Sequence, residues 1–333
     1  MDLPAHSDAP PHGGNLAAAR ARFPGAPEPL LDLSTGIAPR GFPVPELPAS
    51  GFARLPEPSE HAALCDAASR RYAVPPGAEI VAAPGTQILL PMIASLLRPA
   101  SAAILGPTYA EHARAAALAG HAVREVPALS GLGGAALVTV VNPDNPTGRV
   151  LDAACLRGLA EGQRAAGGLL VVDEAFLDAT EGFASAIPLT PEGGVVVLRS
   201  FGKFHGLAGL RLGFAVAAAP IAARLNALLG PWSVSGPALI VAGAAYADPA
   251  WAEGQRRWLA AEAALLDEVL EGAGLTVLGG TPLFRFVQAP PGMFARLGRA
   301  GILVREFPHW PDRLRIGLPP DAASRARLAA ALR

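Results

Sequence analysis

The sequence predicts an α/β protein in which a large domain with a mostly parallel β-sheet is joined to a smaller α+β domain. Three observations favour this class. The chain has 333 residues, too many for one compact pair of layers, so two domains are expected. Apolar runs of strand length alternate with helical stretches from residue 60 to residue 216. Several runs are apolar throughout, as in parallel strands buried on both faces.

The alternation begins after residues 30–58, a segment dense in Pro and Gly that indicates extended coil. Helices are predicted over 60–72, 86–97, 110–119 and 152–166, and strands over 79–83, 102–105, 122–126, 136–141, 169–172, 195–198 and 212–216. A long helix over 249–272 would lead out of the large domain, and strands at 283–287, 302–305 and 313–316 indicate the small one. We therefore predict an N-terminal segment over 1–40, a large domain over 41–255 and a small domain over 256–333.

Composition limits the kinds of partner. Hydrophobic residues make up 51% and charged residues 17% of the chain, which suits a globular protein with a sizeable core. The formal charge of −1 comes without any basic run, so nucleic acid is not expected as a partner. Cys65 and Cys155 are isolated, which suggests no disulfide or thiolate metal site and fits a reducing cytoplasm. No signal-peptide pattern and no membrane span are recognised, so we expect a soluble protein.

Polar residues stand where two apolar strands end. Asn145 follows the strand over 136–141, and Asp173 follows the strand over 169–172. Ligands of open α/β sheets bind at such carboxyl ends. A buried carboxylate is costly unless it meets a cation or a donor, and a pyridinium nitrogen is such a partner. Asn145 in an ordinary turn and Asp173 as a capping or salt-bridged acid remain open alternatives.

A third strand end carries a lysine. Lys203 lies among Phe201, Phe204 and glycines, where desolvation lowers the pKa of an amine and suits Schiff-base chemistry with an aldehyde. Ser200 stands three residues before it and Arg211 eight residues after it, and a hydroxyl and a guanidinium are the groups that a phosphate needs. A solvated lysine in a glycine-rich loop is the alternative.

The ordered set Asn145, Asp173, Ser200, Lys203 and Arg211 resembles the fold-type-I pyridoxal 5′-phosphate (PLP) enzymes. Within them, it is similar to the branch that holds histidinol-phosphate aminotransferase and threonine-phosphate decarboxylase. The resemblance covers nearly the whole chain and implies the aspartate-aminotransferase-like fold, with PLP bound by the large domain. It implies that Lys203 carries the cofactor, that Asp173 bonds its ring nitrogen and that Asn145 bonds its phenolic oxygen.

The resemblance also implies the remaining cofactor contacts. Ser200 and Arg211 would bind the cofactor phosphate, and Gly85, Thr86 and Gln87, which open a helix, would add backbone N–H groups to it. Tyr109 matches the aromatic residue that stacks on the pyridine ring, with a core tyrosine as the alternative.

The expected substrate contacts come from both ends of the chain. Arg315 resembles the arginine that binds the substrate carboxylate, and Arg305 resembles a second arginine used where the substrate carries phosphate. Either could instead be an ordinary surface residue. The run from His12 to Asn15 resembles the opening of threonine-phosphate decarboxylases, a segment that lies over the active site. The substrate-binding residues expected are His12, Gly13, Gly36, Asn145, Arg305 and Arg315.

Four positions depart from the aminotransferase pattern. Phe176 and Leu55 each stand where many relatives have a tyrosine, and Leu55 leaves open whether a partner subunit contributes to the phosphate site. Ala38 replaces a common asparagine, and Gly202 replaces a serine often found before the lysine. None of these changes removes a group on which the expected chemistry depends.

The resemblance implies a PLP-dependent lyase that decarboxylates L-threonine O-3-phosphate to (R)-1-aminopropan-2-yl phosphate in cobalamin biosynthesis, and a homodimer. The alternative is an aminotransferase acting on histidinol phosphate or an aromatic amino acid with the same residues. A third possibility is a protein of this fold that binds an effector without catalysis. The presence of Lys203 and the lack of an added DNA-binding segment argue against it.

Overall fold

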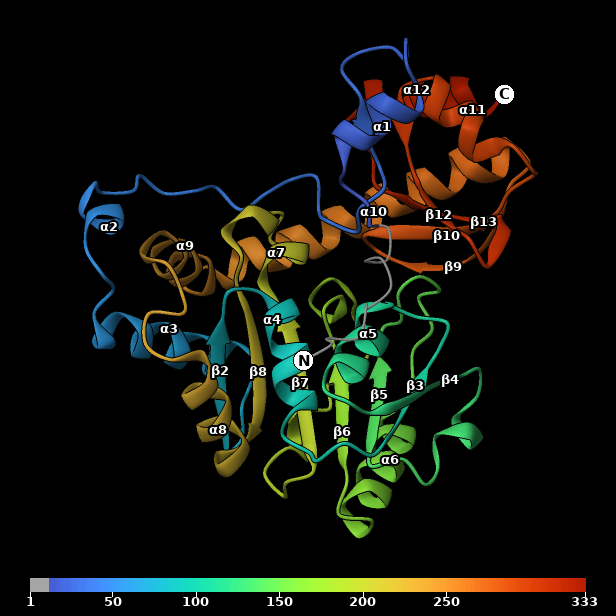
Figure 1. Cartoon of the computed structure of the whole chain (residues 1–333). Helices are drawn as coiled ribbons and strands as arrows, with labels where there is room; N and C mark the ends of the chain where they lie inside the picture. Colours follow the sequence, from blue (N-terminus) through green and yellow to red (C-terminus); the bar gives the residue numbers. More distant parts are fainter. Residues whose placement is uncertain (1–11) are drawn as a thin grey trace.

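The computed structural model describes residues 12–333, which form a large lower domain and a small upper one (Figure 1). The described strands make a seven-stranded sheet in the order β2-β8-β7-β6-β5-β3-β4, a four-stranded sheet in the order β12-β13-β10-β9, and the pair β1-β11. The strands of the large sheet are β2 Ala78–Ala83, β3 Ser101–Leu105, β4 Ala122–Val126, β5 Leu137–Val141, β6 Leu169–Asp173, β7 Val195–Ser200 and β8 Gly213–Ala218. The other strands are β1 Leu31–Asp32, β9 Thr276–Thr281, β10 Phe284–Gln288, β11 Ile302–Leu303, β12 Arg305–Phe307 and β13 Trp310–Gly317.

Helices cover both faces of the large sheet and one side of the small one. The α-helices are α1 Leu16–Arg22, α2 Ser50–Ala53, α3 Pro58–Arg71, α4 Thr86–Ala94, α5 Glu111–Leu118, α6 Ala153–Ala165, α7 Phe201–Phe204, α8 Ala219–Leu229, α9 Gly236–Tyr246, α10 Pro249–Gly272, α11 Met293–Arg299 and α12 Ala322–Leu332. Short 3₁₀ turns lie at Leu129–Leu132, Leu177–Ala179, Ile187–Leu189 and Ala208–Leu210.

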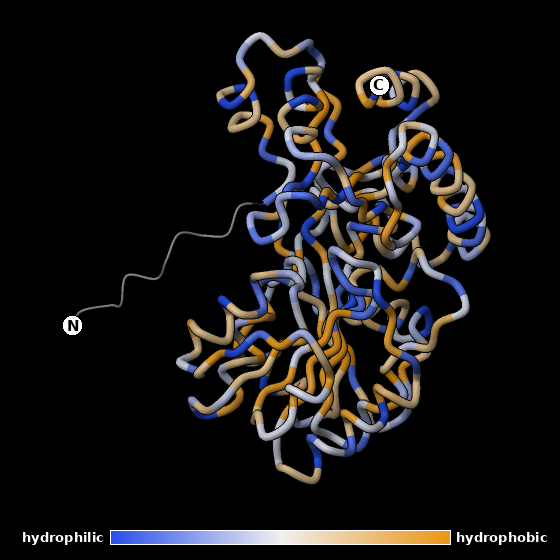
Figure 2. Tube along the Cα trace, turned by 90° about the vertical axis from the view of Figure 1, so that its right-hand side faces the viewer, coloured by the Kyte–Doolittle hydropathy of each residue, from blue (hydrophilic) through white to orange (hydrophobic). Residues whose placement is uncertain are grey.

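The large sheet is mostly parallel, as predicted. Only β8 runs against its neighbours, pairing antiparallel with both β2 and β7. β5 and β6 are buried along their whole length, and successive side chains point to opposite faces. Val138 and Val140 pack in one cluster with α3, α6 and α9, whereas Leu137 packs in another with α4, α5 and α8. Figure 2 shows these apolar strands in the interior of the domain.

The small domain is antiparallel and is joined to the large one by α10 (Figure 1). The predicted range 249–272 coincides with this helix. The predicted boundary between a large domain over 41–255 and a small domain over 256–333 falls inside α10, which is continuous there. These domain limits therefore stay a prediction. Leu31 and Leu33 of the N-terminal segment pack in the same core cluster as Leu297 and Ile302 of the small domain. Residues 1–11 of the predicted segment 1–40 lie outside the described residues.

The strand predicted at 302–305 is in fact two strands. Ile302 and Leu303 pair in parallel with β1, whereas Arg305 pairs with Arg315 on β13, so the chain changes sheets at Val304. β9 was not predicted, because Gly279 and Gly280 interrupt its apolar pattern.

Within residues 12–333, no helix is long and apolar enough to cross a bilayer.

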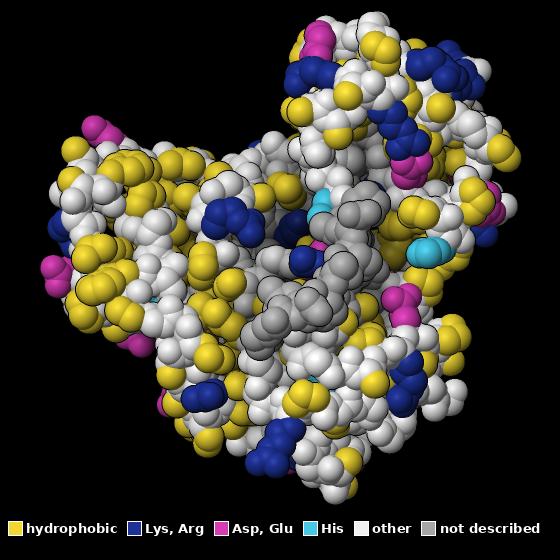
Figure 3. Space-filling view, in the orientation of Figure 1, with side chains coloured by type: hydrophobic (Ala, Val, Ile, Leu, Met, Phe, Trp, Pro, Cys, Tyr) yellow, Lys and Arg dark blue, Asp and Glu magenta, His cyan; other side chains and the backbone are white. Residues whose placement is uncertain are grey.

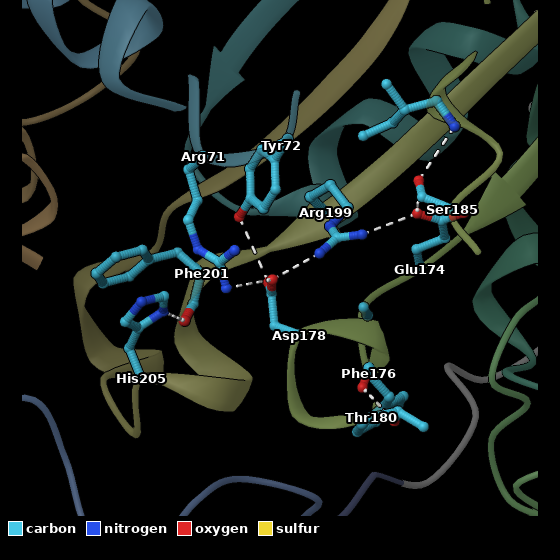
Figure 4. Close-up of polar contacts among 12 residues, drawn as sticks. Arg71, Tyr72, Glu174, Phe176, Asp178, Thr180, Ser185, Arg199, Phe201 and His205 are labelled. Atoms are coloured by element: carbon cyan, nitrogen blue, oxygen red, sulfur yellow. Dashed lines mark hydrogen bonds and ion pairs between the residues drawn. The ribbon is translucent and has the colours of Figure 1, made fainter. Parts of the chain in front are cut away.

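Arg199, near the end of β7, anchors the chain that follows β6 (Figure 4). Its guanidinium donates to Glu174 at 2.9 Å and to Asp178 at 2.5 Å, and all three side chains are buried. Arg71 lies 3.6 Å from Asp178, so two cations face two carboxylates. Burial raises the pKa of Glu174. Burial would also raise the pKa of Asp178, but the charges of Arg199 and Arg71 leave it lowered. The cluster ties the loop after Asp173 to the strand that leads to Lys203.

We predict that Arg199→Met destabilises the fold by ~3–5 kcal/mol, because it leaves two buried carboxylates facing one remaining cation. Urea unfolding at fixed protein concentration measures the change. The variant Arg199→Met/Glu174→Gln/Asp178→Asn removes the uncompensated charges and should recover most of the loss. Arg257→Met, which breaks an exposed pair with Glu253, is the control and should change stability by less than about 1 kcal/mol. Equal midpoints for Arg199→Met and the wild type would contradict this account.

Candidate active site

The predicted site residues converge on one cavity of about 390 Å³, lined by both domains. The carboxyl ends of β5, β6 and β7 form its floor, the start of α4 forms one wall, and β12 and β13 form the side toward the small domain. The predicted residues that line it are His12, Gly13, Gly36, Gly85, Thr86, Gln87, Tyr109, Asn145, Asp173, Ser200, Lys203, Arg211, Arg305 and Arg315.

Asp173 ends β6 and is held from two sides. Its Oδ1 accepts a hydrogen bond from the backbone N–H of Ala175 at 3.0 Å, and its Oδ2 lies 2.9 Å from Nε2 of His112. His112 is buried on α5 and was not predicted. A signal was present in the sequence, since His112 falls within the helix predicted over 110–119, close after Tyr109. The contact fixes the direction of the carboxylate and leaves its cavity side open to another donor.

Lys203 lies on α7, directly after β7. Its Nζ is 5.9 Å from the centre of the Phe176 ring. Burial, followed by the positive charge of Arg315, lowers the pKa of Lys203 to about 8. The backbone N–H of Ala38 donates to the carbonyl of Lys203 at 2.9 Å, which fixes the lysine backbone. Lys203 is also the only lysine in the sequence. The cavity therefore holds the one side-chain amine of the protein, in a state that favours nucleophilic attack.

The start of α4 and Arg211 form a cup for an anion. Gly85 has φ +86°, and a Cβ atom there would lie 2.7 Å from Nη2 of Arg211, so only glycine lets the guanidinium lie against this turn. A Cβ on Gly213 would similarly lie 2.6 Å from the backbone nitrogen of Thr86. The unpaired N–H groups at a helix start favour a phosphate, and the guanidinium adds charge. Ser200 lines the same part of the cavity.

Tyr109 lines the cavity from the loop between β3 and α5. Its hydroxyl donates to Oε1 of Gln87 at 3.0 Å, and burial raises the pKa of the phenol to about 12. The hydroxyl is therefore neutral at ordinary pH.

Asn145 lines the same cavity. Its Oδ1 accepts a hydrogen bond from Arg315 at 2.5 Å, which leaves the amide nitrogen of Asn145 as a donor toward the cavity.

Arg305 and Arg315 are cross-strand partners on β12 and β13, so their side chains share one face. Arg315 also donates from Nη2 to the carbonyl of Ser34 at 2.6 Å, and its buried Nε has no partner among the described residues. Burial, followed by the charge of Arg305, lowers the pKa of Arg315 to about 10. Two neighbouring guanidiniums with an unused donor favour an anionic ligand.

The N-terminal segment reaches the cavity through His12 and Gly13. Gly14 N–H donates to Oγ of Ser34 at 2.8 Å, and a Cβ on Gly13 would lie 2.4 Å from the Ser34 carbonyl. Gly36 lies so close to the ring of Phe176 that a Cβ there would be 2.8 Å away. The structure thus brings His12, Gly13 and Gly36 to the same cavity as Lys203.

Two of the departures from the family pattern have a packing reason. Phe176 is buried and packs edge-on against Phe284, with 5.1 Å between ring centres. A Cβ at Gly202 would lie 2.6 Å from the Cα of Ala208, so a serine there would require the chain to shift.

The sequence analysis did not predict one part of the cavity lining, formed by Glu125 and by residues 307–310, because these residues carry no motif.

The donor set fits PLP. An aldehyde requires an amine of lowered pKa, a phosphate requires the cup at Gly85 and Arg211, and a pyridinium nitrogen requires a fixed carboxylate such as Asp173. The cup in particular depends on glycine, since a Cβ at Gly85 would occupy the space of the guanidinium.

The fold and the cavity define a class of enzymes. The model of the family "Aminotransferase class I and II" matches residues 45–332, and the chain belongs to this family. The fold is that of solved members, such as histidinol-phosphate aminotransferase from Sinorhizobium meliloti in complex with pyridoxal-5′-phosphate. That structure has a TM-score of 0.83 at 23% identity and covers 95% of this chain and 93% of its own.

Within the family, the chain is similar to threonine-phosphate decarboxylases along almost its whole length. The enzyme from Sinorhizobium sp is 44% identical over 329 residues, which cover 96% of this chain and 97% of the relative. The enzyme from Pseudomonas aeruginosa is 41% identical over 330 residues, with 96% of both chains covered. The match thus includes most of the N-terminal segment and of the small domain as well as the large sheet.

We predict that the apoprotein captures PLP covalently with a rate that rises as the pH passes about 8. The neutral amine is the nucleophile, and its share rises through this pH because the pKa of Lys203 is lowered from 10.5. Stopped-flow absorbance between about pH 7 and about pH 9 follows the reaction. Lys203→Ala should show no covalent link, and borohydride should fix the cofactor to the single peptide that holds Lys203. A rate that rises only near the pKa of an ordinary lysine would contradict the burial argument.

Proposed function

We propose that the chain is a PLP-dependent decarboxylase that converts L-threonine O-3-phosphate to (R)-1-aminopropan-2-yl phosphate, a step of cobalamin biosynthesis. The observation that carries this proposal is the presence of two separate anion sites in one cavity. The cup at Gly85 and Arg211 suits the cofactor phosphate, and the set His12, Arg305 and Arg315 suits a substrate with two anionic ends. The near full-length likeness to threonine-phosphate decarboxylases supports the same substrate.

The residues would hold the cofactor as follows. Lys203 binds it covalently, the Asp173 carboxylate accepts a hydrogen bond from the protonated ring nitrogen, and the amide nitrogen of Asn145 donates to the phenolic oxygen. Ser200, Arg211 and the N–H groups of 85–87 bind the phosphate, with Tyr109 against the ring. When bound, PLP accepts the electron pair that is left when a bond at the substrate α-carbon breaks.

The protein's own groups then decide which bond breaks and where protons go. Arg315 binds the substrate carboxylate, while Arg305 and His12 bind the substrate phosphate, and these contacts orient the bonds at the α-carbon. Asp173, held by His112, keeps the positive charge on the ring nitrogen. Nζ of Lys203, which is freed when the substrate amine takes its place, delivers a proton to the α-carbon after carbon dioxide leaves. An aminotransferase would use the same lysine to remove the α-proton, so the pose of the substrate separates the two reactions.

We further propose a cytoplasmic homodimer. Phe52 and Leu55 are 67% and 61% exposed on and beside α2, an unusual exposure for such large apolar side chains. Figure 3 shows hydrophobic surface gathered over this side of the large domain. A groove of about 770 Å³, lined by Leu64, Leu239 and Ile240 among others, lies next to it between α3 and α9. A second copy of the chain would cover this surface.

We predict that the purified holoenzyme releases carbon dioxide from threonine phosphate without any keto acid. Lys203→Ala should abolish turnover, because it removes both the covalent link and the proton donor. Coupled carbon dioxide detection with and without 2-oxoglutarate measures this. Turnover that depends on the keto acid would instead establish an aminotransferase.

We predict that His12→Ala impairs use of threonine phosphate more than use of unphosphorylated threonine. Loss of a hydrogen bond to a charged group costs roughly 1–3 kcal/mol, and only the phosphorylated substrate offers that group. Removal of residues 1–15 should give a larger effect of the same kind and leave the cofactor absorbance intact. The kcat/KM values for both substrates in both variants test this. Equal losses for the two substrates would mean that residues 1–15 do not bind the substrate phosphate.

We predict sedimentation at micromolar protein as a particle of twice the 33.9 kDa chain mass. Phe52→Glu places a charge on the exposed apolar surface beside α9 and should shift the protein toward the monomer. Leu278→Glu is the matched control, since Leu278 is 44% exposed on β9 in the other domain. An active wild-type monomer would overturn the dimer.

A further inference from the structure

Glu111 is a buried acid at the edge of the cavity for which the proposed reaction gives no role. It is the first residue of α5, and its side chain is only 4% exposed. Oε1 lies 3.0 Å from Nε2 of His12, and Oε2 accepts from Nε2 of Gln87 at 2.7 Å and from Nη1 of Arg114 at 3.2 Å. Three donors from three separate segments therefore meet on one carboxylate.

The N-terminal segment has few other attachments at this point. His12 is separated from Glu111 by 99 positions along the chain, and its side chain is 46% exposed. Gly14 N–H donates to Oγ of Ser34, and the Ser34 carbonyl accepts from Arg315. Residues 12–14 thus contact Ser34, and the carbonyl of Ser34 in turn holds Arg315, the arginine proposed to bind the substrate carboxylate. Among the described residues, the contact between His12 and Glu111 is the one contact of residues 12–14 that involves a charged side chain.

The partners of Glu111 require a carboxylate. His12, Gln87 and Arg114 can each present an N–H group, and a carboxylate offers acceptor sites on both oxygens. A glutamine at position 111 would have one accepting oxygen and an NH₂ group that faces at least one of these donors. Because Gln87 and Arg114 both donate to Oε2, the amide oxygen of such a glutamine would stay there and its NH₂ group would face His12. The uncharged residue would then keep the shape of the side chain and lose the attachment of His12.

We propose that Glu111 is a positioning residue that docks residues 12–14 over the cavity by holding Nε2 of His12. With Nε2 donating to Glu111, Nδ1 is the ring nitrogen that can donate to the substrate phosphate when the imidazole carries both protons. The inference rests on the proposed function for its effect on turnover, whereas the docking itself is a property of the chain. Gln87 extends the network to the hydroxyl of Tyr109, so the docked segment lies beside the ring proposed to face the cofactor.

A double-mutant cycle separates positioning through His12 from a general structural role. On the holoenzyme, Glu111→Gln should lower kcat/KM for threonine phosphate by roughly tenfold, mainly through KM, with the visible cofactor absorbance unchanged. In the His12→Ala background, Glu111→Gln should add nothing. Glu28→Gln is the control, because it breaks the exposed pair with Arg20 in the same segment away from the cavity, and it should leave kcat/KM unchanged. Additive losses in the cycle, or loss of the cofactor band, would overturn the proposal.

Hydrogen exchange gives a readout that does not depend on turnover. The amide of Gly14 is protected by its bond to Ser34, so Glu111→Gln should speed its exchange in the holoenzyme, as measured by mass spectrometry. Gly13→Ala, which removes the close approach to Ser34 by steric conflict, should give the same acceleration. Unchanged exchange in Glu111→Gln would refute the docking role. If exchange accelerates in a protein that does not decarboxylate threonine phosphate, the docking stands and the proposed function fails.

Discussion

The active-site geometry depends on the buried charge cluster around Arg199. This side chain stands one residue before Ser200 and binds two carboxylates, Glu174 and Asp178, in the chain that follows Asp173. The same cluster therefore sets the distance between the carboxylate proposed for the ring nitrogen and the strand that leads to Lys203. Buried ions are costly to leave unpaired, so the two strand ends cannot move apart without exposing a charge in the core. The buried ion pairs of Arg199 thus hold the chain after β6 against β7 beside the cavity floor.

The cavity wall toward the small domain is built differently. Glycine backbones, rather than ions, bring the two domains together there. A Cβ on Gly148 would lie 2.1 Å from the carbonyl of Gly280, and a Cβ on Gly279 would lie 2.4 Å from the carbonyl of Thr147. The loop that carries Asn145 therefore lies directly on β9. This close approach helps to explain how Asn145 and Arg315 meet at 2.5 Å although 170 positions separate them.

Much of the cavity could be predicted from the sequence because parallel strands end at one edge of a sheet. Asn145, Asp173 and Lys203 each follow an apolar run, and that regularity is local. The roles given to these residues stay proposals, although the structure brings them together. The contacts that escaped prediction join distant parts of the chain. Glu111 and His12 lack any shared pattern, and the pairing of Arg305 with Arg315 depends on a change of sheet at Val304 that no periodicity indicates. His112 is the exception, since its place in the helix predicted directly after Tyr109 was available.

The presence of a single lysine has a consequence for how the protein meets free cofactor in solution. Aldehydes form adducts with exposed lysines of most proteins, which blurs the count of occupied active sites. Here every other basic side chain is arginine or histidine, and the one lysine lines the cavity. Apart from the terminal amine, the chain offers an aldehyde one amine with which to form an imine. Its visible spectrum can therefore serve as a direct stoichiometric count of loaded sites, free of background from the protein surface.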